Sequence, residues 1–157
     1  MHRSLKDKGF THGIYGDIFL EDLKQYRDQF LERDELSSLY PLWKQDSRAL
    51  LKEFFELGFR AIIVCVNSTY LDESFCERSL DEDLIKDLPA NVDPCGENGE
   101  FHSFVFDGPI FSKPMSFTKG DIIFKEYRAP KNDESECFTD PPQERTGFYF
   151  CDLEPNS

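Results

Sequence analysis

A run of ten residues near the middle of the chain, Asp93–His102, gathers the side chains best suited to chemistry. It contains three carboxylates, one cysteine, one asparagine and one histidine. Its two glycines permit positive φ angles and let a ligand approach backbone N–H groups closely. A turn with only a structural role would not need so many polar side chains, so we predict a functional loop. The predicted substrate-binding residues of this loop are Cys95, Gly96, Glu97, Asn98, Gly99, Glu100 and His102.

Three chemistries compete for this loop. Cys95, His102 and a carboxylate could bind zinc, although their spacing fits no common structural zinc pattern. Cys95 could instead act as a nucleophile with His102 as its base. Recognition of a cationic or amide-bearing substrate by Glu97, Asn98 and Glu100 suits the local negative charge best. We therefore predict substrate binding and assign no metal, and we keep as an alternative a metal-dependent hydrolase that uses Cys95 and His102.

Gly16 and Asp17 form a second candidate site, because they lie between a predicted strand, Phe10–Tyr15, and a predicted helix, Ile18–Arg33. In an open α/β sheet the carboxyl ends of the strands line the ligand crevice. This position would bring Asp17 to a bound nucleotide. Asp is also a favoured N-cap, so the same residue could cap the helix that follows.

Arg27 and Trp43 are candidates to line the same crevice. An arginine offers two parallel hydrogen bonds to a carboxylate or a phosphate, although an ordinary exposed arginine is the simpler reading. Tyr26 lies on the apolar face of its predicted helix, which favours a place in the core over a place in the site.

The elements that would position these residues alternate between strand and helix up to residue 66, which is typical of an α/β fold with a parallel sheet. We predict a partial Rossmann-like parallel sheet in residues 1–66 and an α+β region in residues 67–130. Residues 131–157 are predicted to form a flexible loop, Lys131–Arg145, and a terminal strand. The segment Phe59–Val66 is the clearest predicted strand and is apolar on both faces, as a buried parallel strand should be. Further short strands are predicted within Ile110–Tyr127.

The charge balance excludes several partner classes. Lys and Arg total 18 against 31 Asp and Glu, which gives a net charge of −13. A surface this negative repels nucleic acid and anionic membranes. No window reaches the length of apolar sequence that spans a membrane. The five cysteines are odd in number and form no C-x-x-C pair, which fits reduced thiols in a cytoplasmic protein.

Several segments together resemble the diphthine–ammonia ligase family of ATP pyrophosphatases, which are similar to adenine nucleotide α-hydrolases. The resemblance extends from about Gly13 to Phe111. The segments that carry it are Gly16–Leu23, Tyr26-Arg27, Tyr40–Trp43, Gly58-Phe59, Val92–His102 and Phe106–Phe111. The run around Cys95 is the longest and the most specific of them. Glu77 departs from the pattern, because relatives commonly have glycine there, and this change would reshape a loop.

The resemblance implies an ATP-dependent ligase that uses Mg²⁺ and adenylates a carboxylate for attack by ammonia. The carboxylate would be diphthine on elongation factor 2 in an archaeal or eukaryotic source, and another carboxylate in a bacterium. The family's phosphate loop, Ser-Gly-Gly-Lys-Asp-Ser, is not found in these 157 residues, and neither is G-x-G-x-x-G or G-x-x-x-x-G-K-[ST]. We therefore expect the chain alone to be inactive, and to need a preceding segment or to form a homodimer. A non-catalytic ligand-binding module derived from the family is the alternative.

Overall fold

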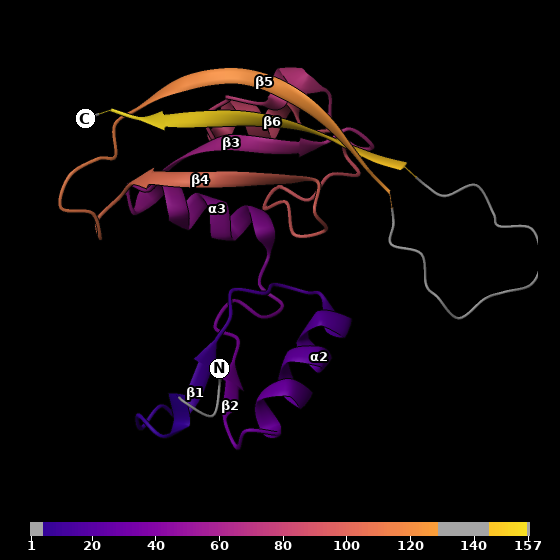
Figure 1. Cartoon of the computed structure of the whole chain (residues 1–157). Coiled ribbons are helices and arrows are strands. Elements are labelled where there is room, and N and C mark those ends of the chain that lie inside the picture. The colour runs from indigo at the N-terminus through magenta and orange to yellow at the C-terminus, as the bar shows by residue number, and fades with distance from the viewer. Residues whose placement is uncertain (1–4, 129–144, 157) are drawn as a thin grey trace, which may run out of the picture. The chain divides into compact units, whose positions relative to one another are not determined.

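The computed structural model of the protein describes residues 5–128 and 145–156 (Figure 1). Its contacts divide the chain into two compact units, Met1–Leu51 and Lys52–Ser157. The elements in chain order are β1 (His12–Ile14), α2 (Glu21–Glu32), β2 (Ser37–Leu39), α3 (Ser47–Glu56), β3 (Arg60–Asn67), the 3₁₀ turn η1 (Glu73–Phe75), α4 (Glu82–Asp87), β4 (Phe101–Asp107), β5 (Phe117–Arg128) and β6 (Arg145–Pro155).

The first unit is a small β-α-β arrangement. β1 and β2 pair in parallel, with His12 opposite Ser37 and Ile14 opposite Leu39. α2 connects them and contributes Leu31, which is almost completely buried. Gly13 allows this close packing, because a Cβ there would lie 2.9 Å from a methyl carbon of Leu31. The predicted alternation of strand and helix with parallel pairing is confirmed for these elements.

The second unit is built on a four-stranded antiparallel sheet in the order β4-β3-β6-β5 (Figure 1). The prediction that Phe59–Val66 is a strand of the parallel sheet is therefore wrong. The segment does form a strand, β3, and seven of its eight residues are buried or partly buried. An apolar run shows that both faces of a strand are covered, and a central antiparallel strand can meet that condition as well. Parallel pairing is confined to β1 and β2 in the part of the chain that the structure describes.

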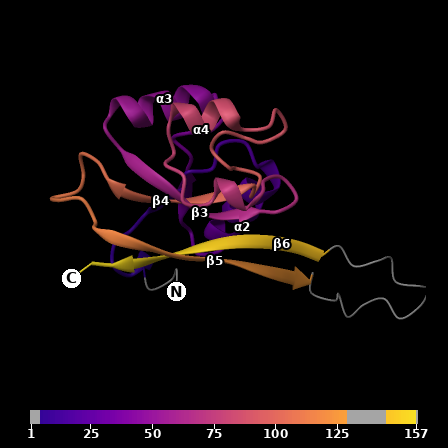
Figure 2. The same ribbon diagram turned by 90° about the horizontal axis from the view of Figure 1, so that it is seen from above.

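The turn from α3 into β3 has a Schellman geometry centred on Gly58. The N–H of Gly58 donates to the carbonyl oxygen of Phe55, and the N–H of Phe59 donates to that of Phe54. Gly58 has φ +82°, the conformation that favours glycine at a helix end. Phe54 and Phe59 stack with their ring centroids 5.1 Å apart, which adds the apolar contact typical of this motif. The ends of α3 and α4 lie on the same side of the strands in Figure 2.

β5 and β6 form a long antiparallel hairpin arm. Where short strands are predicted within Ile110–Tyr127, the structure has one strand of twelve residues with a register shift between Lys119 and Ile122. Gly147 in β6 gives room to Phe124, since a Cβ there would lie 2.3 Å from that ring. The terminal strand is confirmed as β6. The predicted loop, Lys131–Arg145, lies outside the described residues except for Arg145, the first residue of β6.

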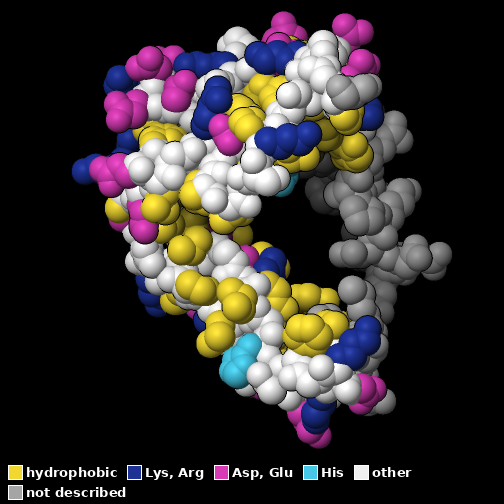
Figure 3. Space-filling view, turned by 90° about the vertical axis from the view of Figure 1, so that its left-hand side faces the viewer, with side chains coloured by type: hydrophobic (Ala, Val, Ile, Leu, Met, Phe, Trp, Pro, Cys, Tyr) yellow, Lys and Arg dark blue, Asp and Glu magenta, His cyan; other side chains and the backbone are white. Residues whose placement is uncertain are grey.

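The surface carries many exposed hydrophobic side chains, drawn in yellow in Figure 3. Ile14 is 70% exposed and Tyr26 is 65% exposed, so the prediction that Tyr26 belongs to the core is wrong. Tyr26 stacks instead on the ring of Phe30 along the outer surface of α2. None of the described helices is both long and apolar enough to cross a membrane.

Candidate functional site

The acidic loop, residues 92–102, is organised around the side chain of Glu100, which has no exposed surface. Its Oε1 accepts hydrogen bonds from the N–H of Asp93 at 2.9 Å and from Nδ2 of Asn98 at 2.9 Å. Its Oε2 accepts from the N–H of Asn98 at 3.0 Å. A buried carboxylate is stable only when donors surround it, and the loop itself supplies them here. Glu100 therefore holds the loop in shape from the inside.

Asp93 anchors the first half of the loop. Its Oδ2 accepts from the N–H groups of Cys95 at 3.0 Å and Glu97 at 3.1 Å. Gly96 lies between these donors with φ +70°, and a Cβ there would come within 2.8 Å of the carbonyl oxygen of Phe101. We predicted that a purely structural turn would not need so many polar side chains. This reasoning is wrong for Asp93, Asn98 and Glu100, because their side chains form hydrogen bonds within the loop. Sequence reasoning omitted Asp93 from the site, although its position before a proline and a glycine marks a turn-forming aspartate.

The loop is fastened to the end of β3 through Asn67, a buried residue that sequence reasoning missed. The N–H of Asn67 donates to the carbonyl oxygen of Glu100 at 2.8 Å, and its Nδ2 donates to that of Gly99 at 3.5 Å. Its Oδ1 accepts from the N–H of Thr69 at 3.0 Å. The polar residue that ends the apolar run of residues 61–66 is the only sequence signal for this role.

Glu97 and Cys95 are partly buried, whereas Asn98 and His102 are exposed. His102 is the second residue of β4 and lies opposite Cys65, while its neighbour Phe101 is buried. Among residues 5–128 and 145–156, no group of three or more His, Cys, Asp or Glu side chains could hold a metal ion. The zinc alternative therefore has no support from the described side chains.

In the first unit, the predicted residues Asp17 and Arg27 come together. Nη1 of Arg27 lies 3.0 Å from Oδ2 of Asp17, and Asp17 is only 7% exposed. The guanidinium also stacks on the ring of Tyr15 at 4.4 Å. The contact between Arg27 and Asp17 is an ion pair, because Oδ2 of Asp17 has no hydrogen-bond partner among the described residues. The prediction that Asp17 could cap the following helix is wrong, because α2 begins three residues later than expected, after Leu20, and no side chain caps it.

The predicted residue Trp43 lies in an aromatic cluster of the same unit. Tyr40 contacts both Trp43, at 5.9 Å between ring centroids, and Tyr15, at 5.5 Å. Tyr15 and Tyr40 thus connect the surroundings of Trp43 to those of Arg27. The predicted neighbour Gly16 is exposed, with nothing within 4 Å of the position of a Cβ.

Lys24 and Asp28 add a charged pair to this cluster. Nζ of Lys24 lies 4.7 Å from the centroid of the Tyr40 ring and donates to Oδ2 of Asp28 at 2.6 Å. The Tyr40 hydroxyl donates to Oδ1 of Asp28 at 3.0 Å. Hydrogen bonds from Lys24 and Ser38 lower the pKa of Asp28, and the bond to Asp28 raises the pKa of Lys24. Burial raises the pKa of Tyr40, so all three side chains keep their usual charge near neutral pH.

Comparison with known proteins gives one family and several named relatives. Residues 46–131 match the family described as the diphthamide synthase C-terminal domain. The diphthine–ammonia ligase of Schizosaccharomyces pombe is 34% identical over 92 residues, which cover 56% of this chain and 15% of that protein. The diphthine–ammonia ligases of Bos taurus and Homo sapiens are each 28% identical over 127 residues, which cover 76% of this chain and 47% of those proteins.

The chain thus spans about half the length of these mammalian relatives. The match of residues 46–131 includes the acidic loop, β3 and β4. It confirms the resemblance that the motifs around Cys95 indicate. This chain belongs to the diphthamide synthase C-terminal domain family.

Proposed function

We propose that this chain forms the substrate-side part of an ATP-dependent amide-forming ligase of the diphthine–ammonia ligase kind, acting in the cytoplasm. The observation that carries the proposal is the acidic loop within the matched domain. Its two anchors, the buried Glu100 and the partly buried Asp93, accept five hydrogen bonds from within the loop. A loop held so firmly can present Glu97 and Asn98 in one fixed arrangement, as substrate recognition requires.

In this reaction an oxygen of the substrate carboxylate attacks the α-phosphorus of ATP, and pyrophosphate leaves as the bond to it breaks. The lone pair of ammonia then attacks the acyl carbon. The bond between that carbon and the phosphate oxygen breaks, AMP leaves, and the nitrogen loses a proton to give the amide. Diphthine on elongation factor 2 is the carboxylate that we propose.

Within the loop, Glu97 and Asn98 would bind the substrate, and Glu100 would act as a positioning residue. In the first unit, Asp17 and Arg27 would lie at the nucleotide crevice. The described side chains include no group of three or more His, Cys, Asp and Glu that could hold a metal ion, so no step runs through a metal held by such a group. The proposal assigns the ATP phosphates to a phosphate loop outside these 157 residues, supplied by a preceding segment or by a second chain.

The test uses the protein as it is made in its source cells, with any segment that precedes these residues. It is incubated with ATP, ammonium and elongation factor 2 that carries diphthine, and AMP and the modified factor are measured by mass spectrometry. We expect AMP and amide to form in equal amounts. The Glu97→Gln variant should lose about tenfold or more in kcat/KM, as for loss of one charge-assisted contact.

A matched control is Glu53→Gln, which removes the same charge from an exposed position on α3 and should leave kcat/KM unchanged. Binding of the diphthine-bearing factor without any AMP release would favour the ligand-binding module instead. If the protein neither binds the diphthine-bearing factor nor releases AMP, the proposal is overturned.

A further inference from the structure

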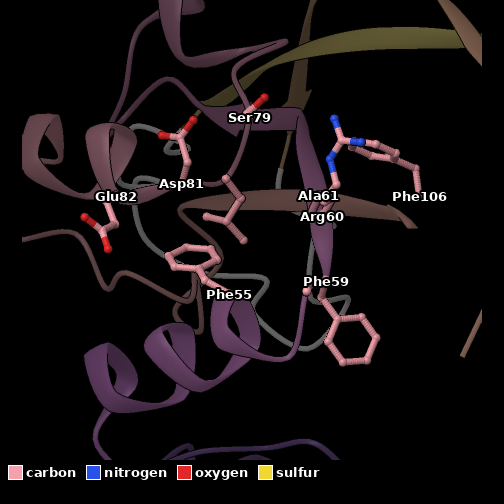
Figure 4. A pocket seen from close by; sticks show the side chains of 10 residues that line it. Phe55, Phe59, Arg60, Ala61, Ser79, Asp81, Glu82 and Phe106 are labelled. Carbon is pink, nitrogen blue, oxygen red and sulfur yellow. The ribbon is translucent and has the colours of Figure 1, made fainter. Parts of the chain in front are cut away.

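A pocket of about 470 Å³ lies in the second unit, where the end of α3, the start of β3 and the start of α4 meet (Figure 4). Its volume is within the range of small-molecule sites. The acidic loop contributes no residue to it. The pocket is therefore a separate feature of the unit, and the proposed ligase function does not use it.

The body of the pocket is aromatic. Phe55 comes from the last turn of α3, Phe59 follows Gly58, and Phe106 comes from β4. The Schellman turn at Gly58 reverses the chain so that Phe55 and Phe59 both reach this space. Three aromatic rings provide a large apolar contact area at a small cost in side-chain entropy. This part of the pocket suits an aromatic or aliphatic group.

One side of the pocket carries two carboxylates, Asp81 and Glu82, which we call the acidic rim. Figure 4 shows their carboxylates on one side of Phe55 and Arg60 on the other. Oδ1 of Asp81 accepts two backbone hydrogen bonds from the first turn of α4, at 3.1 and 2.9 Å. Its second oxygen, Oδ2, takes no part in this cap and remains available to a ligand.

The basic side chains that flank the acidic rim in sequence form their ion pairs with other carboxylates, and the Coulomb interactions of Lys86 with Glu82 and Asp81 are weaker than its interaction with Asp83. Lys86 donates to Asp83 at 2.8 Å, and Arg78 donates to Asp87 at 2.7 Å. Neither residue of the acidic rim forms an ion pair within the part of the chain that the structure describes. The rim therefore keeps two negative charges next to an apolar space, which favours a cation.

Arg60 does not cancel this charge. Its guanidinium lies 5.0 Å from the centroid of the Phe106 ring and 3.6 Å from Oδ2 of Asp107, which faces it across the β3–β4 pair. The positive charge of Arg60 is thus balanced by Asp107 and its planar group lies on Phe106. The excess charge along the pocket remains negative.

We propose that this pocket binds a small organic cation with an aromatic or apolar body. The ammonium group would be held by Asp81 and Glu82, and the body would pack against Phe55, Phe59 and Phe106. Coulomb attraction and removal of the apolar body from water would act together, each in the part of the pocket suited to it. A carboxylate of the same size would meet repulsion at the acidic rim.

Phenethylamine is a suitable probe, with phenylacetate as an anionic control that has the same ring. The full chain, labelled with ¹⁵N, is titrated with each compound, and backbone amide shifts are followed by nuclear magnetic resonance. We expect phenethylamine to shift the amides of residues 55–61 and 79–82 in a saturable way. Phenylacetate should bind about tenfold more weakly or not at all, as expected from the reversed charge.

Two conservative variants test the acidic rim. Asp81→Asn keeps a favoured N-cap side chain, and Glu82→Gln keeps the size of the original. The double variant should bind phenethylamine about tenfold more weakly, as for loss of charge-assisted contacts. Glu154→Gln, an exposed position on β6, removes a charge away from the pocket and should change nothing. Equal binding of both compounds, full binding by the double variant, shifts elsewhere, or no saturable shift would overturn the proposal.

Discussion

The buried carboxylate of Glu100 binds Asn98 twice, once through its backbone N–H and once through its side-chain amide. The two residues are separated only by Gly99, which takes φ +81° so that the chain can turn back on itself. A third donor, the N–H of Asp93, closes the loop from its other end. Glu100, which the sequence predicts to bind substrate, is therefore the residue that shapes the loop.

The substitution Glu100→Gln should destabilise the second unit. A glutamine presents one acceptor oxygen and one NH₂ group to a site that holds only donors, so at least one buried N–H loses its partner. The expected cost is about 1–3 kcal/mol in the free energy of unfolding. Hydrogen exchange of the amides of Asp93 and Asn98 measures it locally, and urea unfolding measures it globally. Glu97→Gln is the matched control, and equal stability of the two variants would contradict the role of Glu100.

The two glycines of the loop should differ in their response to alanine. Both have positive φ, +70° at Gly96 and +81° at Gly99. Only at Gly96 would a Cβ collide, at 2.8 Å from the carbonyl oxygen of Phe101, since nothing lies within 4 Å at Gly99. Gly99→Ala should cost about 1–2 kcal/mol from backbone strain alone. Gly96→Ala should cost clearly more in the same urea titration, and the reverse order would refute this account of the loop.

The elements of the fold were largely predictable, because helix and strand signals are local. The cap of α4 by Asp81 and the end of α3 at Gly58 follow directly from residue type. The pairing of β3 was not predictable, because burial on both faces does not distinguish a parallel from an antiparallel neighbour. The residues of β6 that pair with β3 also lie 81 to 85 positions further along the chain, as for Phe148 opposite Asn67.

The residues of the candidate loop stand out in the sequence, but their roles within the loop do not. A dense polar run identifies the loop, yet only the fold shows which carboxylate points inward. Glu77 gives a further example, since the resemblance implies glycine at this position and the structure gives Glu77 φ +63°. That left-handed backbone explains why glycine suits the position. Here Lys119 supports the turn by donating to the carbonyl oxygen of Glu77 at 2.8 Å.

The ion pair of Asp17 and Arg27 should stabilise the first unit. Both side chains are less than a third exposed, so breaking the pair leaves a charge without its partner in a partly desolvated position. Asp17→Asn should lower the unfolding free energy by about 1–3 kcal/mol. Trp43, the only tryptophan of the chain, reports the unfolding of this unit by fluorescence.

The exposed pair of Lys52 and Glu56 provides the contrast. Their side chains are 76% and 66% exposed, so Glu56→Gln should change stability by less than about 0.5 kcal/mol. A double-mutant cycle with Asp17→Asn and Arg27→Met should give a coupling of about 1 kcal/mol. A coupling energy of zero would show that the contact between Asp17 and Arg27 does not stabilise the first unit.

The lowered pKa of Asp28 predicts a pH dependence of the first unit. Hydrogen bonds from Lys24 and Ser38 lower the folded pKa below the ordinary value of 3.8. The resulting stability is therefore fully present above that ordinary value and is lost as the pH falls through the folded pKa. In fluorescence-detected urea titrations, the stability gap between the wild type and Asp28→Asn should narrow below about pH 4. A gap of constant size from pH 7 to pH 2 would contradict the assignment.

The cysteines should react in two classes. Burial raises the pKa of Cys76 and of Cys151 to about 11, and burial also raises the pKa of Cys65. The thiolate is the reactive form, so at pH 8 these thiols should resist iodoacetamide in the folded protein and react only in urea. Cys95 is partly buried and lies in the acidic loop, where it should be alkylated in the folded state. Peptide mapping separates each site from Cys137, which lies outside the described residues. Equal alkylation of Cys76 and Cys95 in the folded protein would contradict this prediction. It would show that the second unit opens readily, because the buried thiol of Cys76 can react only when the unit opens.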